Sequence, residues 1–162
     1  MARVIAVADT HIPKVGPALP DGLLERFAGA DLILHAGDLI EMSVLDELRS
    51  LAPTRAVVGN MDLPEVRSLL PEKTVIEVEG KLIGLIHGWG PPLGVERRVL
   101  SRLPGVDVAV FGHTHKALVE TRKGILLVNP GTPNDRRFSD RLSYAVLTIE
   151  NGEIETEIIW LD

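Results

Sequence analysis

The stretch Val106-Asp107-Val108-Ala109-Val110-Phe111 runs directly into Gly112-His113-Thr114-His115. An apolar, β-branched run of this length is typical of a buried strand, which we predict over residues 107–111. The two imidazoles beyond it can turn toward one point only if the backbone leaves regular pleating. We expect Gly112 to permit this, because glycine tolerates backbone angles that other residues avoid. Taken alone, the two histidines are compatible with a polar turn or with a metal site.

The same arrangement recurs along the chain, because apolar runs at residues 4–8, 31–35, 55–58 and 82–86 also end in polar residues. Each of these endings, taken separately, is compatible with an ordinary turn. Ligand sites in open α/β sheets lie beyond the carboxyl ends of strands, so one crevice can collect all of these side chains. The candidate metal ligands are Asp9, His11, Asp38, Asn60, His87, His113 and His115. His35 lies within an apolar run, and we interpret it as a structural histidine that finds a hydrogen bond.

The order of the expected elements indicates an α/β fold. In the first third, strands alternate with helices expected over residues 22–28 and 43–51, with Asp21 and Ser43 as N-caps, which favours parallel strands joined by right-handed crossovers. The remainder favours mostly antiparallel strands. Its expected elements are hairpins at residues 74–86, 117–128 and 142–160 and a helix over 95–103. We therefore expect one domain over residues 1–162, with two packed sheets and helices outside.

The composition excludes several classes of protein. The net charge of −6 argues against a generic binder of nucleic acid or acidic membranes, which usually has a basic surface. The chain has no cysteine, so any metal must be held by His, Asp, Glu, Asn or backbone oxygen. The apolar N-terminal run is too short for a signal peptide, and no run approaches the length of a membrane span. We expect a cytoplasmic protein.

Five short motifs together resemble the signature blocks of the calcineurin-like metallophosphoesterases. They are Asp9-x-His11, Gly37-Asp38, Gly59-Asn60-x-Asp62, His87-Gly88 and Gly112-His113-x-His115. Their order and spacing are similar to those of the small bacterial and archaeal phosphodiesterase branch. The segment Asn129-Pro130-Gly131-Thr132 also resembles that branch.

The resemblance implies a four-layer α/β/β/α sandwich of two mixed β-sheets flanked by helices, with two divalent metal ions at their edge. It places Asp9, His11 and His115 on one ion. It places Asn60, His87 and His113 on the other, with Asp38 bridging the two. We expect manganese first, with iron, cobalt, nickel and zinc as alternatives that suit the same donors. With two carboxylates among neutral ligands, the site keeps about two positive charges, which suits a phosphate ester.

The resulting hypothesis is direct hydrolysis of a phosphodiester by a metal-bridging hydroxide, with Asp38, Asn60 and His113 as catalytic residues. Many family members have a histidine, able to protonate the leaving group, where this chain has Met61. A thioether cannot act as a general acid. We therefore expect slow turnover of esters with poor leaving groups, or an acid supplied from elsewhere. Asp62 either orients Asn60 or caps a helix.

Substrate contacts and alternatives remain open. Arg136 and Arg137 either clamp a phosphate or lie in a solvated loop, and Trp89 either stacks on an aryl group or packs within its loop.

The alternatives to a phosphodiesterase are a phosphomonoesterase or nucleotidase, and a metal-binding scaffold without catalysis, as in a relative from membrane-trafficking complexes that has lost metal ligands. All seven ligand positions are competent here, which favours an enzyme. The expected partner is a small-molecule phosphate ester. We expect nucleic acid only as a substrate and no membrane, and apolar residues at 158–160 can support a homodimer.

Overall fold

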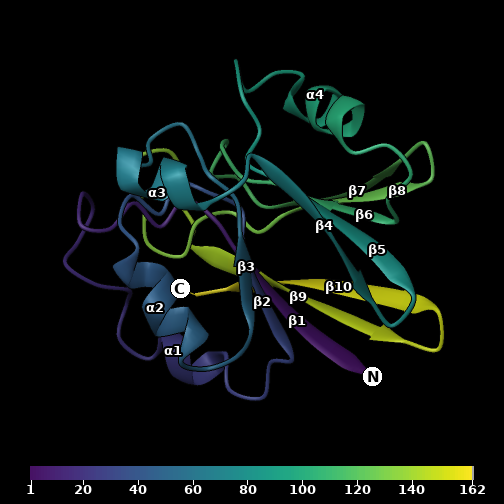
Figure 1. The fold of residues 1–162 in the computed structure, drawn as a ribbon, viewed down its shortest axis with the longest axis horizontal. Helices are drawn as coiled ribbons and strands as arrows, with labels where there is room; N and C mark the ends of the chain where they lie inside the picture. Colours follow the sequence, from purple (N-terminus) through teal and green to yellow (C-terminus); the bar gives the residue numbers. More distant parts are fainter. Residues whose placement is uncertain (162) are drawn as a thin grey trace.

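The computed structural model describes residues 1–161, which form two five-stranded sheets (Figure 1). The first sheet has the strand order β10-β9-β1-β2-β3. Its strands are β1 (Ala2–Val7), β2 (Leu32–His35), β3 (Thr54–Ala56), β9 (Ser143–Glu150) and β10 (Glu153–Trp160). Strands β1, β2 and β3 are parallel, as predicted, while the last hairpin joins the sheet antiparallel to β1.

The second sheet has the order β4-β5-β6-β8-β7. Its strands are β4 (Lys73–Val78), β5 (Lys81–Ile86), β6 (Val108–Val110), β7 (Leu118–Arg122) and β8 (Ile125–Asn129). The central strands β5, β6 and β8 are parallel, and only the edge strands β4 and β7 pair antiparallel. The expectation of mostly antiparallel strands is wrong for this centre. After β6 the chain forms the edge strand β7, and β8 then returns to lie between β6 and β7. The sequence indicates the local β7–β8 hairpin but not the parallel pairing of β8 with β6.

Four short helices flank the sheets: α1 (Leu23–Arg26), α2 (Ser43–Arg49), α3 (Pro64–Leu69) and α4 (Val95–Arg102). The two predicted N-caps are wrong. Gly22 is the N-cap of α1 and Met42 that of α2, and neither end has a side-chain capping bond. Helix α3 has no counterpart among the predicted elements; it begins with Pro64, whose missing N–H costs nothing at a first helical position.

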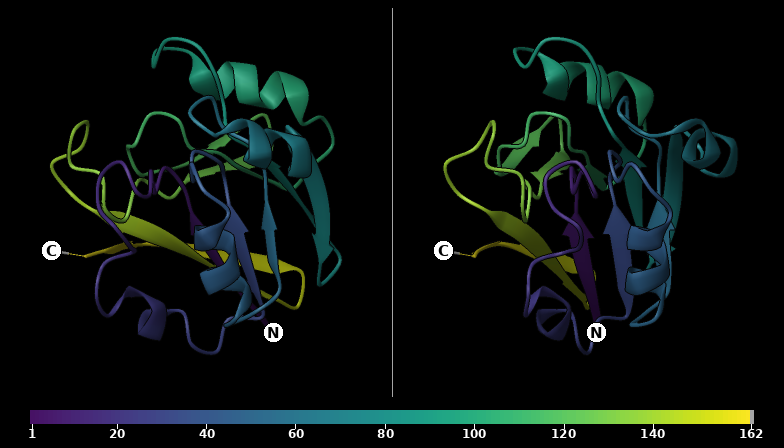
Figure 2. Two further views of the ribbon diagram at one scale, coloured as in Figure 1. Left: turned by 60° about the vertical axis from the view of Figure 1, so that its left-hand side comes forward. Right: turned by 90° about the vertical axis from the view of Figure 1, so that its left-hand side faces the viewer.

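Three apolar clusters hold four layers together. One lies between the first sheet and helices α1 to α3, one between the two sheets, and one between the second sheet and α4. Along β1, Ile5 and Val7 face the helices while Val4 and Ala6 face the other sheet. Each fully buried Ile or Val side chain contributes about 1.5–3 kcal/mol relative to exposure. The predicted α/β/β/α sandwich is confirmed, and Figure 2 shows α4 and the pair α1 and α2 on opposite outer faces.

The loops after four parallel strands meet at one edge of the sandwich. After β1 and β2, the Asp9 N–H donates to the Gly37 carbonyl over 3.0 Å. After β5 and β6, the Gly112 N–H donates to the His87 carbonyl over 3.0 Å. This edge therefore collects the polar residues that follow the strands. Among residues 1–161, no helix is both long and apolar enough to cross a membrane.

Candidate functional site

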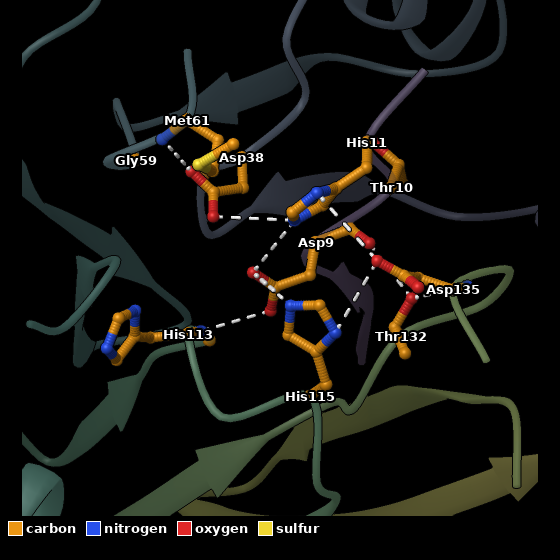
Figure 3. A network of polar contacts seen from close by, with 12 residues as sticks. Asp9, Thr10, His11, Asp38, Gly59, Met61, His113, His115, Thr132 and Asp135 are labelled. Atoms are coloured by element: carbon orange, nitrogen blue, oxygen red, sulfur yellow. Dashed lines mark hydrogen bonds and ion pairs between the residues drawn. The ribbon is translucent and has the colours of Figure 1, made fainter. Parts of the chain in front are cut away.

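Two buried carboxylates, Asp9 and Asp38, lie at the centre of the site (Figure 3). The Asp9 Oδ1 atom is 3.7 Å from His11 Nε2, 3.5 Å from His115 Nε2 and 3.8 Å from His87 Nε2. The Asp38 Oδ2 atom is 3.4 Å from His11 Nε2 and 3.2 Å from His87 Nε2. Two sets of side chains, Asp9 with His11 and His115, and Asp9 with Asp38 and His87, bring their ligand atoms within 4.8 Å of one another.

Among the central side-chain atoms that lack a hydrogen-bond partner within residues 1–161, two lie 3.7 Å apart. They are Asp9 Oδ1 and His11 Nε2, both inaccessible to solvent. Leaving a polar atom buried and unpaired is costly, and such atoms in native proteins usually find a partner. A divalent cation among carboxylate and imidazole donors satisfies both atoms, and this donor set suits first-row transition metals. The residues present therefore fit a divalent metal site.

Asn60 and His113 lie beside His87. The Asn60 Oδ1 atom is 3.0 Å from His87 Nε2. The His113 ring lies edge-on to the His87 ring at a centroid distance of 5.3 Å, and Figure 3 shows it turned away from His115. His113 Nε2 donates to the Gly90 carbonyl over 2.7 Å, which leaves Nδ1 as the ring's lone-pair nitrogen. The His113 backbone N–H donates to Asp9 Oδ2 over 3.0 Å, so this loop also holds Asp9.

The charges at the centre stabilise one another. Burial opposes protonation of His87, but Asp38 and Asp9 outweigh it and raise the pKa of His87 to about 9. Burial alone would raise the pKa of Asp38; the neighbouring His11 and His87 rings instead hold the pKa of that carboxyl well below its usual range. Without a cation, His87 therefore carries a proton at neutral pH, and a metal ion that uses His87 as a ligand must displace it.

Gly112 has a different role from the predicted one. The left-handed backbone is adopted by His113 and His115 themselves, at φ of 74° and 63°, and Gly112 has no positive φ. A Cβ atom on Gly112 would lie 2.7 Å from Asp9 Oδ2 and 2.8 Å from the Ala8 Cβ. Glycine is required here because the backbone passes directly over Asp9, and the prediction that Gly112 supplies the unusual angles is wrong.

Asp62 ties together the loops that carry Asp38 and Asn60. Its buried carboxylate accepts N–H bonds from Gly59 at 2.7 Å, Asp38 at 3.1 Å and Ile40 at 2.6 Å. Helix α3 begins after Leu63, so Asp62 is not its N-cap. Asp62 acts on Asn60 through the neighbouring backbone, since its carboxylate accepts bonds from the main-chain N–H groups of Gly59, Asp38 and Ile40.

A cavity of about 490 Å³ opens over the centre. It is lined by His11, Lys14, Asp38, Asn60, Met61, Pro92, His113, Thr114, His115, Lys116, Arg137 and Phe138. Three cations from separate loops, Lys14, Lys116 and Arg137, therefore face one cavity, which favours an anionic guest. Lys14, Lys116 and Phe138 are missed by sequence reasoning, because surface lysines and a loop phenylalanine have no distinguishing local pattern.

The predicted substrate residues separate in the structure. Arg137 lines the main cavity and Arg136 does not. Both arginines line a neighbouring hollow, and Arg136 donates to the Asp140 carbonyl over 3.2 Å. Trp89 lines a second pocket of about 290 Å³, with the Arg102 guanidinium 5.8 Å from its ring centroid. The two pockets share one wall residue, Asn60.

His35 is confirmed as a structural histidine. Its Nδ1 accepts the Gly37 N–H over 3.1 Å, so Nε2 carries the ring hydrogen and faces Thr10 Oγ1 at 3.0 Å. Complete burial lowers the pKa of His35 to about 4, which keeps the ring neutral. This bond network supports the turn between β2 and Asp38.

The segment Asn129–Thr132 forms hydrogen bonds to the backbone of two central loops. Asn129 Nδ2 donates to the Gly112 carbonyl over 3.1 Å, and Thr132 Oγ1 donates to the Asp9 carbonyl over 2.9 Å. Thr132 Oγ1 also accepts the N–H of Asp135, a buried carboxylate that lies beside His11 and His115. Sequence reasoning missed Asp135. It is one of several charged residues in its loop, and no local sequence pattern distinguishes it from the others.

Two carboxylates and three imidazoles, buried where two mixed sheets meet, define an α/β protein with a site for a divalent metal. The family model of the calcineurin-like phosphoesterase superfamily domain matches residues 2–152, and the chain belongs to this family. A probable metallophosphoesterase of Methanothermobacter thermautotrophicus is 38% identical over 155 residues, covering 94% of this chain and 89% of that protein. Family and site together indicate a metal-dependent phosphoesterase.

Two solved structures have the same fold. Vps29 of Entamoeba histolytica complexed with Zn²⁺ is 26% identical, with a TM-score of 0.76 and 98% of each chain covered. A structure described as a novel archaeal phosphodiesterase is 20% identical, with a TM-score of 0.75, covering 97% of this chain and 99% of that one. At 20% identity, the similarity to the archaeal phosphodiesterase shows a shared fold and nothing more.

Proposed function

We propose that the protein is a phosphodiesterase that uses two divalent cations. Asp9, His11 and His115 would hold one, and Asn60, His87 and His113 the other, with Asp38 between them. The observation that carries this proposal is the position of Asp38 Oδ2, at 3.4 Å from His11 Nε2 and 3.2 Å from His87 Nε2, one histidine from each set. The unpaired atoms Asp9 Oδ1 and His11 Nε2 support it independently.

The bound cations would supply Lewis acidity that polarises the phosphoryl group and activates water, and manganese is our first choice for both. The chain's own residues do the positioning. The Met61 N–H holds Asp38 by a 2.7 Å bond to Oδ1, which leaves Oδ2 facing the histidines. The hydrogen bond to the Gly90 carbonyl fixes the orientation of the His113 ring. Asn60 lines both pockets. We propose Asp38, Asn60 and His113 as the catalytic residues.

The cavity walls support a diester with an apolar substituent. Phe138 and Met61 add apolar surface to this cavity, and Lys14, Lys116 and Arg137 add positive charge. The pocket beyond Asn60, where Trp89 offers an aromatic face, gives the second substituent of a diester a place of its own. A monoester needs one pocket only, and the cationic walls favour its dianion, which keeps a phosphomonoesterase or nucleotidase as the second candidate. A non-catalytic scaffold is the third, since Vps29 shares the fold.

The test compares two esters on one metal-exchanged protein. The purified chain is stripped with a chelator and reloaded with Mn²⁺, and hydrolysis of bis(p-nitrophenyl) phosphate and p-nitrophenyl phosphate is measured. We expect Mn²⁺-dependent hydrolysis with the higher kcat/KM for the diester, lost in His113→Ala with the fold retained. A higher kcat/KM for the monoester favours the second candidate. Tight binding of two cations without hydrolysis of either ester contradicts both enzyme proposals and favours the scaffold.

A further inference from the structure

Asp135 lies beside His11 and His115, at the ring nitrogens that do not face Asp9. Its side chain is fully buried, and Oδ2 lies 3.8 Å from His11 Nδ1 and 3.7 Å from His115 Nδ1. On their other side, both rings present Nε2 to Asp9 Oδ1, at 3.7 Å and 3.5 Å. Figure 3 shows the two imidazoles standing side by side between the same two carboxylates.

The chemistry of imidazole gives this arrangement a direction. A ring that offers its Nε2 lone pair to a cation must carry its hydrogen on Nδ1. Histidine ligands usually donate that hydrogen to a carboxylate or carbonyl, which fixes both the tautomer and the ring orientation. His115 Nδ1 is buried and has no hydrogen-bond partner, and Asp135 Oδ2 is the carboxylate oxygen that faces it.

We propose that Asp135 is the shared positioning residue of His11 and His115, accepting the Nδ1 hydrogens of both rings and holding both Nε2 atoms toward Asp9. The inference rests on the proposed function, since it requires a cation on the Asp9, His11 and His115 set. It adds a residue that lies outside that set and acts only through the two histidines.

Arg137 binds both carboxylate oxygens of Asp135. Its Nε donates to Asp135 Oδ1 over 2.9 Å and its Nη2 to Oδ2 over 2.7 Å. These bonds outweigh burial, which alone would raise the pKa of Asp135, and keep the pKa of that carboxyl below its usual range. Nη2 also lies 3.1 Å from His11 Nδ1. A guanidinium can only donate, so this contact must give way once His11 carries its hydrogen on Nδ1.

The first experiment measures cation affinity in the full chain. Mn²⁺ and Zn²⁺ are titrated calorimetrically into the wild type and Asp135→Asn, an isosteric change that removes the charge. We expect affinity about 10–100-fold weaker in Asp135→Asn, the range typical for partners of ligand histidines. The matched control is Asp107→Asn, whose carboxylate accepts the Leu82 N–H over 2.8 Å away from the site, and we expect its affinity to be unchanged.

The second experiment detects the tautomer directly and does not depend on a variant that folds. Long-range ¹H–¹⁵N spectra of the Zn²⁺-loaded wild type should show the hydrogen of His11 and His115 on Nδ1. Hydrogens on Nε2, or equal affinities for the wild type and Asp135→Asn, would overturn the inference while leaving the proposed function intact. A wild type that binds neither cation would instead contradict the proposed function itself, and the inference with it.

Discussion

Backbone strain is concentrated in the residues that carry the central side chains. Asp9, His11 and Asp38 have φ of 55°, 47° and 59°, and His113 and His115 have 74° and 63°. A non-glycine residue held in a sparsely populated region costs about 1–3 kcal/mol and persists only where its surroundings fix it. The fixing contacts are the 3.0 Å bonds of Asp9 N–H to the Gly37 carbonyl and of His113 N–H to Asp9 Oδ2.

At this scale we predict that Gly112→Ala disrupts the site. The added methyl would lie 2.7 Å from Asp9 Oδ2, so either Asp9 or the loop must move. We expect a loss of about 1–3 kcal/mol in the free energy of unfolding, as for other overpacked sites, together with weaker Mn²⁺ binding. Urea denaturation and calorimetry measure the two effects. Gly16→Ala is the control, since its nearest neighbour would be the Ala18 carbonyl at 3.8 Å; equal behaviour of the two variants would contradict the prediction.

We also predict a gain of function in Met61→His. Met61 is 40% exposed and lines the main cavity beside Asp38 and Asn60, where an imidazole can reach a leaving group. General acid catalysis is commonly worth about 10²–10⁴-fold, so kcat/KM for an alkyl phosphodiester should rise by at least about tenfold, while an aryl diester changes little. Steady-state assays with the two esters measure the difference. An unchanged rate on the alkyl ester would show that Met61 does not limit catalysis.

At the scale of elements, the loops after the strands are held by carboxylates that bond to backbone. Asp62, just before α3, accepts three N–H groups from two different loops, at Gly59, Asp38 and Ile40. Arg67 of α3 adds to this by donating from Nη2 to the Asn60 carbonyl over 2.6 Å and from Nε to the Asp62 carbonyl over 3.0 Å. Helix α3 therefore serves to position the loop that carries Asn60.

The prediction for this element is that Asp62→Ala loosens both loops at once. It leaves three buried N–H groups without an acceptor, and each costs about 1–3 kcal/mol. We expect a lower urea midpoint and faster amide hydrogen exchange at Gly59 and Asp38, with exchange at the β9–β10 hairpin following only the global stability. Asp31→Ala, which removes the acceptor of the single Arg3 N–H bond, is the control. Exchange that rises uniformly over the chain would contradict the local role.

Strand-end polar residues could be predicted from the sequence because buried strands are apolar runs and their ends are polar, as at Val7 to Asp9. Pairings between distant elements could not. Nothing in residues 143–160 indicates that β9 lies beside β1, and nothing in residues 118–129 indicates that β8 lies beside β6, since each hairpin fixes only its own register. Asp135 could not be predicted as a site residue for the same reason, because its position depends on contacts with His11 and His115, which are remote in sequence.

At the scale of the whole molecule, an acidic chain with a net charge of −6 presents three cations around one cavity. We infer that the two sheets form one domain, because the cluster between them takes buried residues such as Leu34 and Leu85 from both. The homodimer stays a prediction. Trp160 on β10 is 41% exposed, and the Arg141 guanidinium lies 3.7 Å from its ring centroid.

Stability of the metal-free protein should depend on pH through the central charges. His87 has a pKa of about 9 when folded, above its ordinary 6.5, so its contribution is complete below pH 6.5 and lost as pH rises to about 9. Asp38, with a depressed pKa, contributes above its ordinary 3.8 and loses this as pH falls further. We expect the urea midpoint of the metal-free chain to fall as pH rises from 6.5 to about 9, and to fall less in His87→Gln. A midpoint that rises from pH 6.5 to 9 would contradict this.

The most direct test of the proposed two-cation centre is an anomalous difference map from crystals of the Mn²⁺-loaded protein. We predict two manganese peaks about 3.5–4 Å apart, as in other two-metal sites. One should contact Asp9, His11 and His115, the other Asn60, His87 and His113, with Asp38 touching both. A single peak, or peaks that leave Asn60 and His113 without a metal contact, would contradict it.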